Sequence, residues 1–279
     1  MAISDNEGKF KGNIGGLTYR IVNGKTIVQS KPAARTVKQT ESTKASQNDF
    51  SLGSNRAKIL RLVLSPLIKG LQDKAMVNRL TTAVAAVVRS NITLPAGFRD
   101  LEDGQLGLLE GFEFNVHSPF ADRCKANLRM EQNSLAGFKI SIAPFEVKKA
   151  IVFPGLATGC TFRVLLAAIN FKENRYQYCG TAELNIPVDR DAVPATEWVF
   201  VENLPPDCLF IAACSMEFFG NGLFEPISLN NKQLHPVKLI GLMPGQQVSE
   251  QVPVPQAADS LWHNWQPIPG IDGNKIRKR

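Results

Sequence analysis

The chain has 279 residues, of which 44% are hydrophobic and 20% are charged, so it can form one or two ordinary cores. No segment approaches the roughly 18 consecutive apolar residues that a membrane span needs. Residues 1–7 lack the basic start and apolar stretch of a signal peptide. We therefore expect synthesis in the cytoplasm without a membrane span, and we leave open release by a signal-independent route.

The charge is unevenly distributed along the chain, whose net charge is +7. Residues 1–90 contain 15 Lys and Arg against 5 Asp and Glu, whereas residues 91–279 contain 17 against 20. Such polarity suits binding to nucleic acid or another anionic surface. It equally suits head-to-tail assembly, in which the basic part of one copy meets the acidic part of the next. A solvated basic face without a partner is the third interpretation.

Residues 9–30 predict β structure. Asn23-Gly24 lies between two β-branched runs, which is a strong hairpin signal because a type I′ turn needs positive φ at both central positions. A lone two-stranded hairpin is marginally stable, so this one must pack against the chain's own body or against a neighbour. Alternation places three apolar side chains on one face of the hairpin: Leu17, Tyr19 and Ile21.

A polar, basic segment and a helical pair follow the hairpin. Residues 31–47 show no apolar periodicity and predict an extended arm, so the first division covers residues 1–47. Residues 48–92 predict a two-helix hairpin, with a weak capping signal at Ser46 and Asp49 and a break at Gly70. The first helix has apolar residues at a spacing of three and four: Ala57, Leu60, Leu64 and Leu67.

The period changes from helical to two at about Leu108. Alternating segments such as 112–116 and 138–142, then longer ones such as 161–171 and 176–186, predict about nine short antiparallel strands. We expect an antiparallel β region over residues 93–145 and a β-sandwich over residues 146–243. These form either one elongated sandwich or two small ones, with a boundary near Ala143-Pro144. The predicted fold class is therefore α+β, mainly β.

The last segment, residues 244–279, is rich in proline and ends in a basic run. Proline at this density opposes regular structure, so we predict a tail that is extended unless it docks. Trp262 and Trp265 are candidates for anchoring it, on the same subunit or on another copy, because Trp is a favoured interface residue.

No catalytic, metal or cofactor motif withstands inspection. The five cysteines form no C-x-x-C pair and lie in apolar or alternating segments, which predicts reduced packing residues. The three histidines show no ligand spacing, and no nucleophile elbow occurs. Gly12, Gly15 and Gly16 lack the phosphate-loop pattern and fit a bulge or close backbone approach. We therefore predict that the protein is not an enzyme and binds no cofactor or metal.

Several segments taken together resemble an uncharacterised Bacteroidota protein family, over most of residues 9–242. The resemblance implies a bacterial origin and a β-rich fold but assigns no site, and it does not extend to the tail. The residues that carry it are Val28-Gln29-Ser30-Lys31-Pro32, the strand entry Ala150 to Arg163, and Phe218-Phe219-Gly220-Asn221-Gly222.

Appendages at both ends of a sandwich are typical of an assembly subunit, in which an end strand adds to a neighbour's sheet. The leading hypothesis is a non-enzymatic structural protein that forms a homo-oligomer, filament or particle with other copies of itself, as part of a larger bacterial assembly. The residues expected at the interface are Leu17, Tyr19, Ile21, Ile27, Val28, Trp262 and Trp265.

Two alternatives remain open. A nucleic-acid-associated protein would use phosphate contacts, although only Tyr19 and Phe50 lie nearby to stack on bases. A carbohydrate-binding or small-ligand module would use an aromatic sandwich face with Tyr176, Tyr178 or Trp198, which core packing explains equally. The basic residues expected to contact an anion are Arg35, Lys38, Lys44, Arg56, Lys58 and Arg61.

Overall fold

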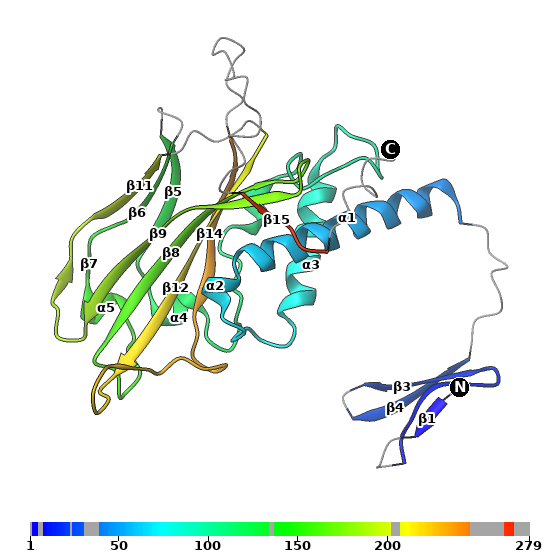
Figure 1. The fold of residues 1–279 in the computed structure, drawn as a ribbon, viewed down its shortest axis with the longest axis horizontal. Helices are drawn as coiled ribbons and strands as arrows, with labels where there is room; N and C mark the ends of the chain where they lie inside the picture. The colour runs from blue at the N-terminus through cyan, green and yellow to red at the C-terminus, as the bar shows by residue number, and fades with distance from the viewer. Residues whose placement is uncertain are drawn as a thin grey trace, which may run out of the picture. The chain divides into compact units, whose positions relative to one another are not determined.

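The structure is a computed structural model, and it divides into two compact units, residues 1–44 and 45–279 (Figure 1). Strands hold 41% of the residues and helices 24%, which confirms the predicted α+β, mainly β class. Each unit is described on its own below. The residues that the structure describes are 2–4, 8–22, 24–30, 39–133, 137–201, 207–245 and 265–270.

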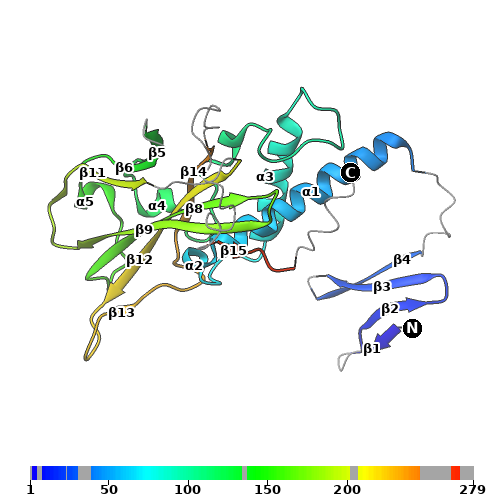
Figure 2. The ribbon, with the colours of Figure 1, turned by 45° about the horizontal axis from the view of Figure 1, so that its top comes forward.

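Unit 1 contains a four-stranded antiparallel sheet in the order β1-β2-β3-β4 (Figure 2). The predicted hairpin is present, since Val22 pairs with Lys25 and Gly24 has a φ of +76°. A second tight turn, at Gly15-Gly16, connects β2 to β3, and β1 pairs with the other edge of β2. The bounds are β1 Ala2–Ser4, β2 Phe10–Ile14, β3 Leu17–Val22 and β4 Lys25–Ser30.

The predicted helical pair is present, but its first helix begins earlier than expected. Helix α1 spans Glu41–Val63, so residues 41–47 of the predicted arm are helical. The reason is the cap: the Thr40 hydroxyl accepts a hydrogen bond from the Thr43 amide at 3.2 Å, whereas Asp49 accepts one from the Gly97 amide. The helices that follow are α2, Ser65–Ile68, and α3, Met76–Ser90.

The centre of unit 2 is a six-stranded antiparallel sheet in the order β13-β12-β8-β9-β15, in which β14 also pairs with β12. Its second edge is formed by the tail, because Gln266 pairs with Tyr176. The bounds are β8 Gly159–Asn170, β9 Arg175–Pro187, β12 Leu209–Gly220, β13 Ile227–Ser228, β14 Val237–Pro244 and β15 Gln266–Pro267.

A three-stranded sheet, β11-β6-β5, forms the second layer of the sandwich. Strand β6 pairs with strands from both sides of Ala143-Pro144, so a single sandwich crosses that predicted boundary. Residues 112–116, predicted as a strand, make only one bridge, Glu113 to Lys238. The remaining elements are β5 Leu128–Asn133, β6 Gly137–Ile142, β7 Phe145–Glu146, β10 Ala192–Val193, β11 Thr196–Val201, η1 Leu106–Leu109, α4 Phe120–Arg123 and α5 Val147–Ala150.

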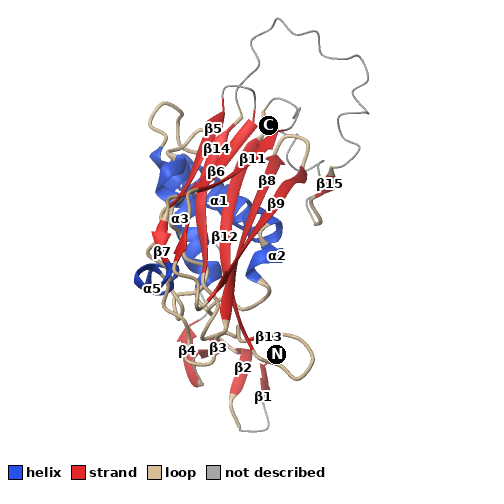
Figure 3. Cartoon of the chain, turned by 90° about the vertical axis from the view of Figure 1, so that its left-hand side faces the viewer, coloured by secondary structure: helices blue, strands red, loops and turns tan. Residues whose placement is uncertain are grey.

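Unit 2 thus has three layers and two cores. Helices α1 to α3 pack on one face of the six-stranded sheet, where Leu60 and Val84 join Leu165 in one buried cluster. The three-stranded sheet covers the opposite face, where Ile140 and Phe162 belong to the second cluster. Figure 3 views the strands from the side of the three-stranded sheet, with the helices behind them. Burial on both faces explains why strand β8 is apolar along nearly its whole length.

Candidate functional site

The N-terminal sheet has one strongly apolar side, called here the apolar face. Strand pairing aligns Gly12, Tyr19 and Val28 across β2, β3 and β4, and it aligns Ile14 with Leu17 in the next row. Because side chains two apart share a face, the apolar face consists of Phe10, Ile14, Leu17, Tyr19, Ile21 and Val28.

This face is not part of a core. Phe10 is 44% exposed and Val28 is 51% exposed, and none of the described side chains in the four strands is buried. The one ring contact on it joins Phe10 to Tyr19, with the ring centroids 5.9 Å apart. Within unit 1, the described residues provide no second layer over the face. A sheet with one apolar side normally buries it against another element.

The opposite side of the sheet, called here the basic face, carries the charged residues together with three exposed apolar ones, Ile3, Val22 and Ile27. It carries Lys11, Arg20 and Lys25, and the Thr18 hydroxyl donates a hydrogen bond to the Asn13 side chain at 2.8 Å. The alternation of side chains therefore leaves the apolar face without a charged residue in the described strands, whereas the basic face mixes charged and apolar side chains.

The structure brings together four of the five hairpin residues expected at an interface. Leu17, Tyr19, Ile21 and Val28 share the apolar face, but Ile27 pairs with Arg20 and lies on the basic face. The sequence interpretation missed Phe10 and Ile14, although their alternation with Gly12 before a Gly-Gly turn was a usable signal.

The two tryptophans expected as anchors have different outcomes. Trp265 is 6% exposed and belongs to the core between the two sheets, so it holds the tail on the chain's own body. That burial removes its side chain from contact with another copy. Trp262 lies outside the described residues.

The residues predicted to contact an anion have different outcomes. Arg35 and Lys38 lie outside the described residues, and Lys44 forms an ion pair with Glu41 at 2.7 Å. Lys58 and Arg61 remain together, beside a cavity on α1. The prediction that Arg56 contacts an anion is wrong, because its side chain is buried and cannot reach a nucleic-acid phosphate.

Arg56 instead holds α1 to the rest of unit 2. Its guanidinium forms an ion pair with Asp100, and it lies 4.0 Å from the centre of the Phe171 ring. Nearby, burial and the charge of Asp100 raise the pKa of Glu102 to about 7, against an ordinary value of 4.5. The residues around Arg56 and Asp100 therefore form a structural charge cluster, in which the carboxyl of Glu102 is readily protonated.

Glu102 should make stability depend on pH. Its pKa is higher in the folded state than in the unfolded state, so its contribution is present below about pH 4.5 and lost as pH rises through about 7. We expect Glu102→Gln to match the wild type at pH 5 and to exceed it at pH 8 by about 1–2 kcal/mol, after allowance for solvent screening. Urea unfolding at both pH values measures this, and equal gains at both would contradict it.

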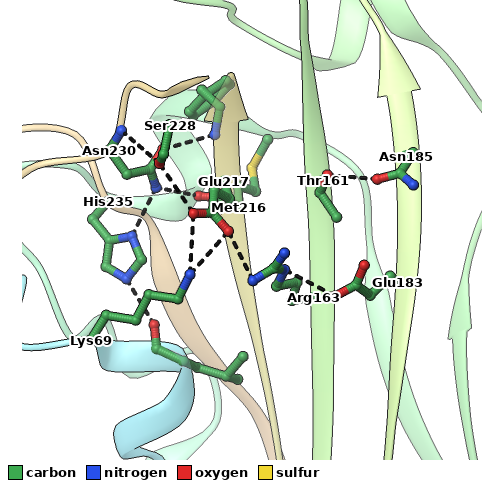
Figure 4. A network of polar contacts seen from close by, with 12 residues as sticks. Lys69, Thr161, Arg163, Glu183, Asn185, Met216, Glu217, Ser228, Asn230 and His235 are labelled. Carbon is green, nitrogen blue, oxygen red and sulfur yellow. Dashed lines mark hydrogen bonds and ion pairs between the residues drawn. The ribbon is translucent and has the colours of Figure 1, made fainter. Parts of the chain in front are cut away.

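A polar network lies where α2 meets strand β12 (Figure 4). Lys69, in a left-handed conformation after α2, reaches Glu217 at 3.0 Å, and Arg163 also contacts Glu217 at 3.0 Å. Arg163 bridges further to Glu183 at 3.1 Å. Burial alone would raise the pKa of Glu217, but the adjacent Lys69 and Arg163 lower it below its ordinary value. Each charge is therefore compensated, as in a structural network.

His235 is the buried end of this network. Its Nε2 donates to the Leu67 carbonyl and its Nδ1 accepts from the Asn230 side chain, both at 2.8 Å. Asn230 also bonds the backbone of Met216 and Phe218, so the pair ties the loop after β12 to α2. Burial lowers the pKa of His235 from 6.5. With 1% of its surface exposed, His235 has no access to a substrate.

The neutral state of His235 predicts acid sensitivity. Because its folded pKa is depressed, its contribution to stability is present above about pH 6.5 and is lost as pH falls below that value. Urea unfolding between pH 7.5 and 5.5 measures how steeply the free energy of unfolding falls with pH. We expect this slope to be smaller in His235→Gln than in the wild type, by up to about 1 kcal/mol per pH unit. His117→Gln, at an exposed histidine, is the control. Equal slopes in all three proteins would refute the assignment.

The aromatic residues of the ligand-binding alternative are packing residues. The Tyr176 hydroxyl donates to Gln266 at 2.6 Å, and the Tyr178 hydroxyl donates to the Val63 carbonyl at 3.2 Å. Burial raises the pKa of Tyr178 to about 12. Trp198 packs partly buried against the core between the sheets. The three residues therefore do not form an open aromatic platform.

The described residues also bear on metal, thiol and membrane chemistry. Within those ranges no group of three His, Cys, Asp or Glu side chains is placed to hold a metal ion. Four of the five cysteines are buried, and burial raises the pKa of Cys160 to about 12. No helix in the described part of the chain is long and apolar enough to cross a membrane.

Two comparisons with known proteins find no relative of this chain. A scan against models of protein families finds no match to this chain, and a search of curated proteins finds none. The resemblance to the Bacteroidota family stays a prediction.

Proposed function

We propose that this protein is a non-enzymatic structural subunit that assembles with other copies of itself. The apolar face of its N-terminal sheet would dock on a neighbouring copy. The single observation that carries the proposal is this face: six apolar side chains gathered on one side of a sheet, none of them buried. A face of this kind marks an interaction site more often than a solvated surface.

The energetics favour covering the apolar face. Burying a large apolar side chain completely contributes roughly 1.5–3 kcal/mol, so six partly exposed ones would contribute about 1 kcal/mol each when covered. Part of that gain offsets the loss of translational and rotational freedom on association. The six contributions total about 6 kcal/mol, which is comparable to that cost of roughly 4–15 kcal/mol, so apolar surface buried on the neighbouring copy has to add to the gain.

Charge supports docking between copies as well. The basic face carries Lys11, Arg20 and Lys25, while residues 91–279 contain 20 acidic against 17 basic residues. Attraction between the sheet of one copy and the acidic part of another would guide their encounter. A homo-oligomer, a filament and a particle are all compatible with such head-to-tail contacts.

The test is the mass of the protein in solution. Size-exclusion chromatography with light scattering should show a large species for the full chain and a monomer for a variant that starts at Gln39. That variant keeps the Thr40 cap of α1 and both cores of unit 2. A monomeric full chain at low and high salt would overturn the proposal. Nucleic acid eluting with the full chain at low salt only would favour the nucleic-acid alternative.

A further inference from the structure

A patch of exposed apolar side chains, called here the apolar tip, lies at one end of the six-stranded sheet of unit 2. It is built around the loop of residues 221–226, which joins β12 to β13 (Figure 2). Three of its side chains are almost fully exposed and the fourth is about half exposed. The apolar tip consists of Leu156, Leu223, Phe224 and Ile227, which are 82%, 95%, 99% and 51% exposed.

Close backbone contacts hold the apolar tip together. Ile227 pairs with Gly220 at the end of β12. A Cβ on Gly220 would lie 2.8 Å from the Leu156 carbonyl oxygen, and one on Gly222 would lie 2.9 Å from the Ile227 side chain. Glycine at both positions therefore lets the loops approach each other. Single exposed apolar residues need no explanation, but a contiguous group marks an interaction site.

The described ends of the tail adjoin the opposite end of these strands. Gly245 lies next to the start of β12, and the Ile268 amide donates to the Asn174 carbonyl just before β9. Residues 246–264 leave and return at that end, and residues 271–279 are fewer, so neither extends more than about 35 Å from it. Strand β12, with 12 residues, is about 40 Å long, and the apolar tip lies beyond it. The tail therefore does not cover the apolar tip.

Charge makes the N-terminal sheet of another copy a fitting occupant of this surface. Residues 8–22 and 24–30 carry four basic side chains and no acidic one. The loops at the apolar tip, residues 152–158, 188–191 and 221–226, carry three acidic side chains and one basic one. An anionic membrane or a nucleic acid would be repelled by the same acidic groups.

We propose that the apolar tip of one copy is the acceptor for the apolar face of the next copy's N-terminal sheet, an inference that rests on the proposed function. The apolar side chains of the tip cover the apolar face around Tyr19, and attraction between the basic sheet and the acidic loops guides the encounter. Because the two surfaces differ, the contact is heterologous. Repeating it produces a filament or a closed ring, not a two-fold dimer.

A single variant of the full chain tests the acceptor surface by light scattering. Phe224→Lys adds a charge to the apolar tip at a side chain that is 99% exposed, so the fold of unit 2 is retained. We expect the dissociation constant of the assembly to rise at least about 10-fold, because the contact would remove the lysine from water. Phe98→Lys, at a 72% exposed phenylalanine elsewhere in unit 2, is the matched control and should assemble like the wild type.

A mixing experiment tests whether the contact is heterologous. Tyr19→Lys alters only the apolar face, and Phe224→Lys alters only the apolar tip. At a concentration between the dissociation constants of the wild type and the variants, each variant should be monomeric. An equimolar mixture should form a dimer of one copy of each, which cannot grow because its two remaining surfaces are the altered ones.

The outcomes separate this inference from the proposed function. If the wild type assembles and Phe224→Lys assembles equally well, or if the mixed variants stay monomeric, the apolar tip is not the acceptor, although self-assembly stands. If the wild type assembles only as far as a dimer, two N-terminal sheets pack on each other and the heterologous contact is wrong. If the wild type is monomeric, both proposals are overturned.

Discussion

Replacing Tyr19 with lysine is expected to abolish self-assembly. Tyr19 lies between Gly12 and Val28 at the centre of the apolar face, and its ring contacts Phe10. A lysine there would place an unpaired charge at the centre of the contact, which costs several kcal/mol when water is removed. We expect the dissociation constant to rise at least about 100-fold, which corresponds to about 2.7 kcal/mol. Light scattering across a dilution series measures it.

The matched control is Ile27→Lys on the basic face. Ile27 pairs with Arg20 in the same sheet and is 42% exposed, so the substitution adds an identical charge to the opposite side. We expect this variant to assemble like the wild type. If both variants dissociate alike, the effect is one of net charge or sheet stability. If Tyr19→Lys assembles normally, the apolar face is not the contact.

The positions of Tyr19 and Ile27 show which side chains can be assigned to a face from alternation alone and which cannot. Alternation alone places Leu17, Tyr19 and Ile21 on one face, because the side-chain period of a strand is two. In β4, the face of each residue depends on the register with β3. The two-residue turn pairs Val22 with Lys25, and this register places Val28 on the apolar face and Ile27 on the basic face. The sequence predicts the strand that carries Phe10 only as part of a longer β segment, because glycines 15 and 16 fit a bulge or close backbone approach as well as a turn.

Long-range partners limited the prediction of single side chains in unit 2. The helical period correctly predicted the buried stripe of α1, which includes Ala57 and Leu60. It could not show that Arg56, beside that stripe, meets Asp100, which is 44 residues away in sequence. Likewise, proline content indicated an extended tail, but the burial of Trp265 depends on the core between the two sheets. Neither contact has a local signature.

Arg56→Met is expected to be strongly destabilising, and this prediction separates the structural role of Arg56 from anion binding. The side chain of Arg56 is 5% exposed and that of Asp100 is 28% exposed, so methionine leaves a partly buried carboxylate without its cation. It also removes the cation–π contact with Phe171. Breaking a buried pair costs 3–5 kcal/mol, and the partial exposure of Asp100 places the expected loss near about 3 kcal/mol.

Two further variants decide why Arg56→Met is destabilising. Lys58→Met, at an exposed position two residues along the same helix, should change the free energy of unfolding by less than about 0.5 kcal/mol. Adding Asp100→Asn to Arg56→Met should recover part of the loss, because the unpaired charge is then gone. Urea unfolding measures all of them. If Arg56→Met is as stable as the wild type but weakens binding to nucleic acid, Arg56 is a surface contact and the burial argument fails.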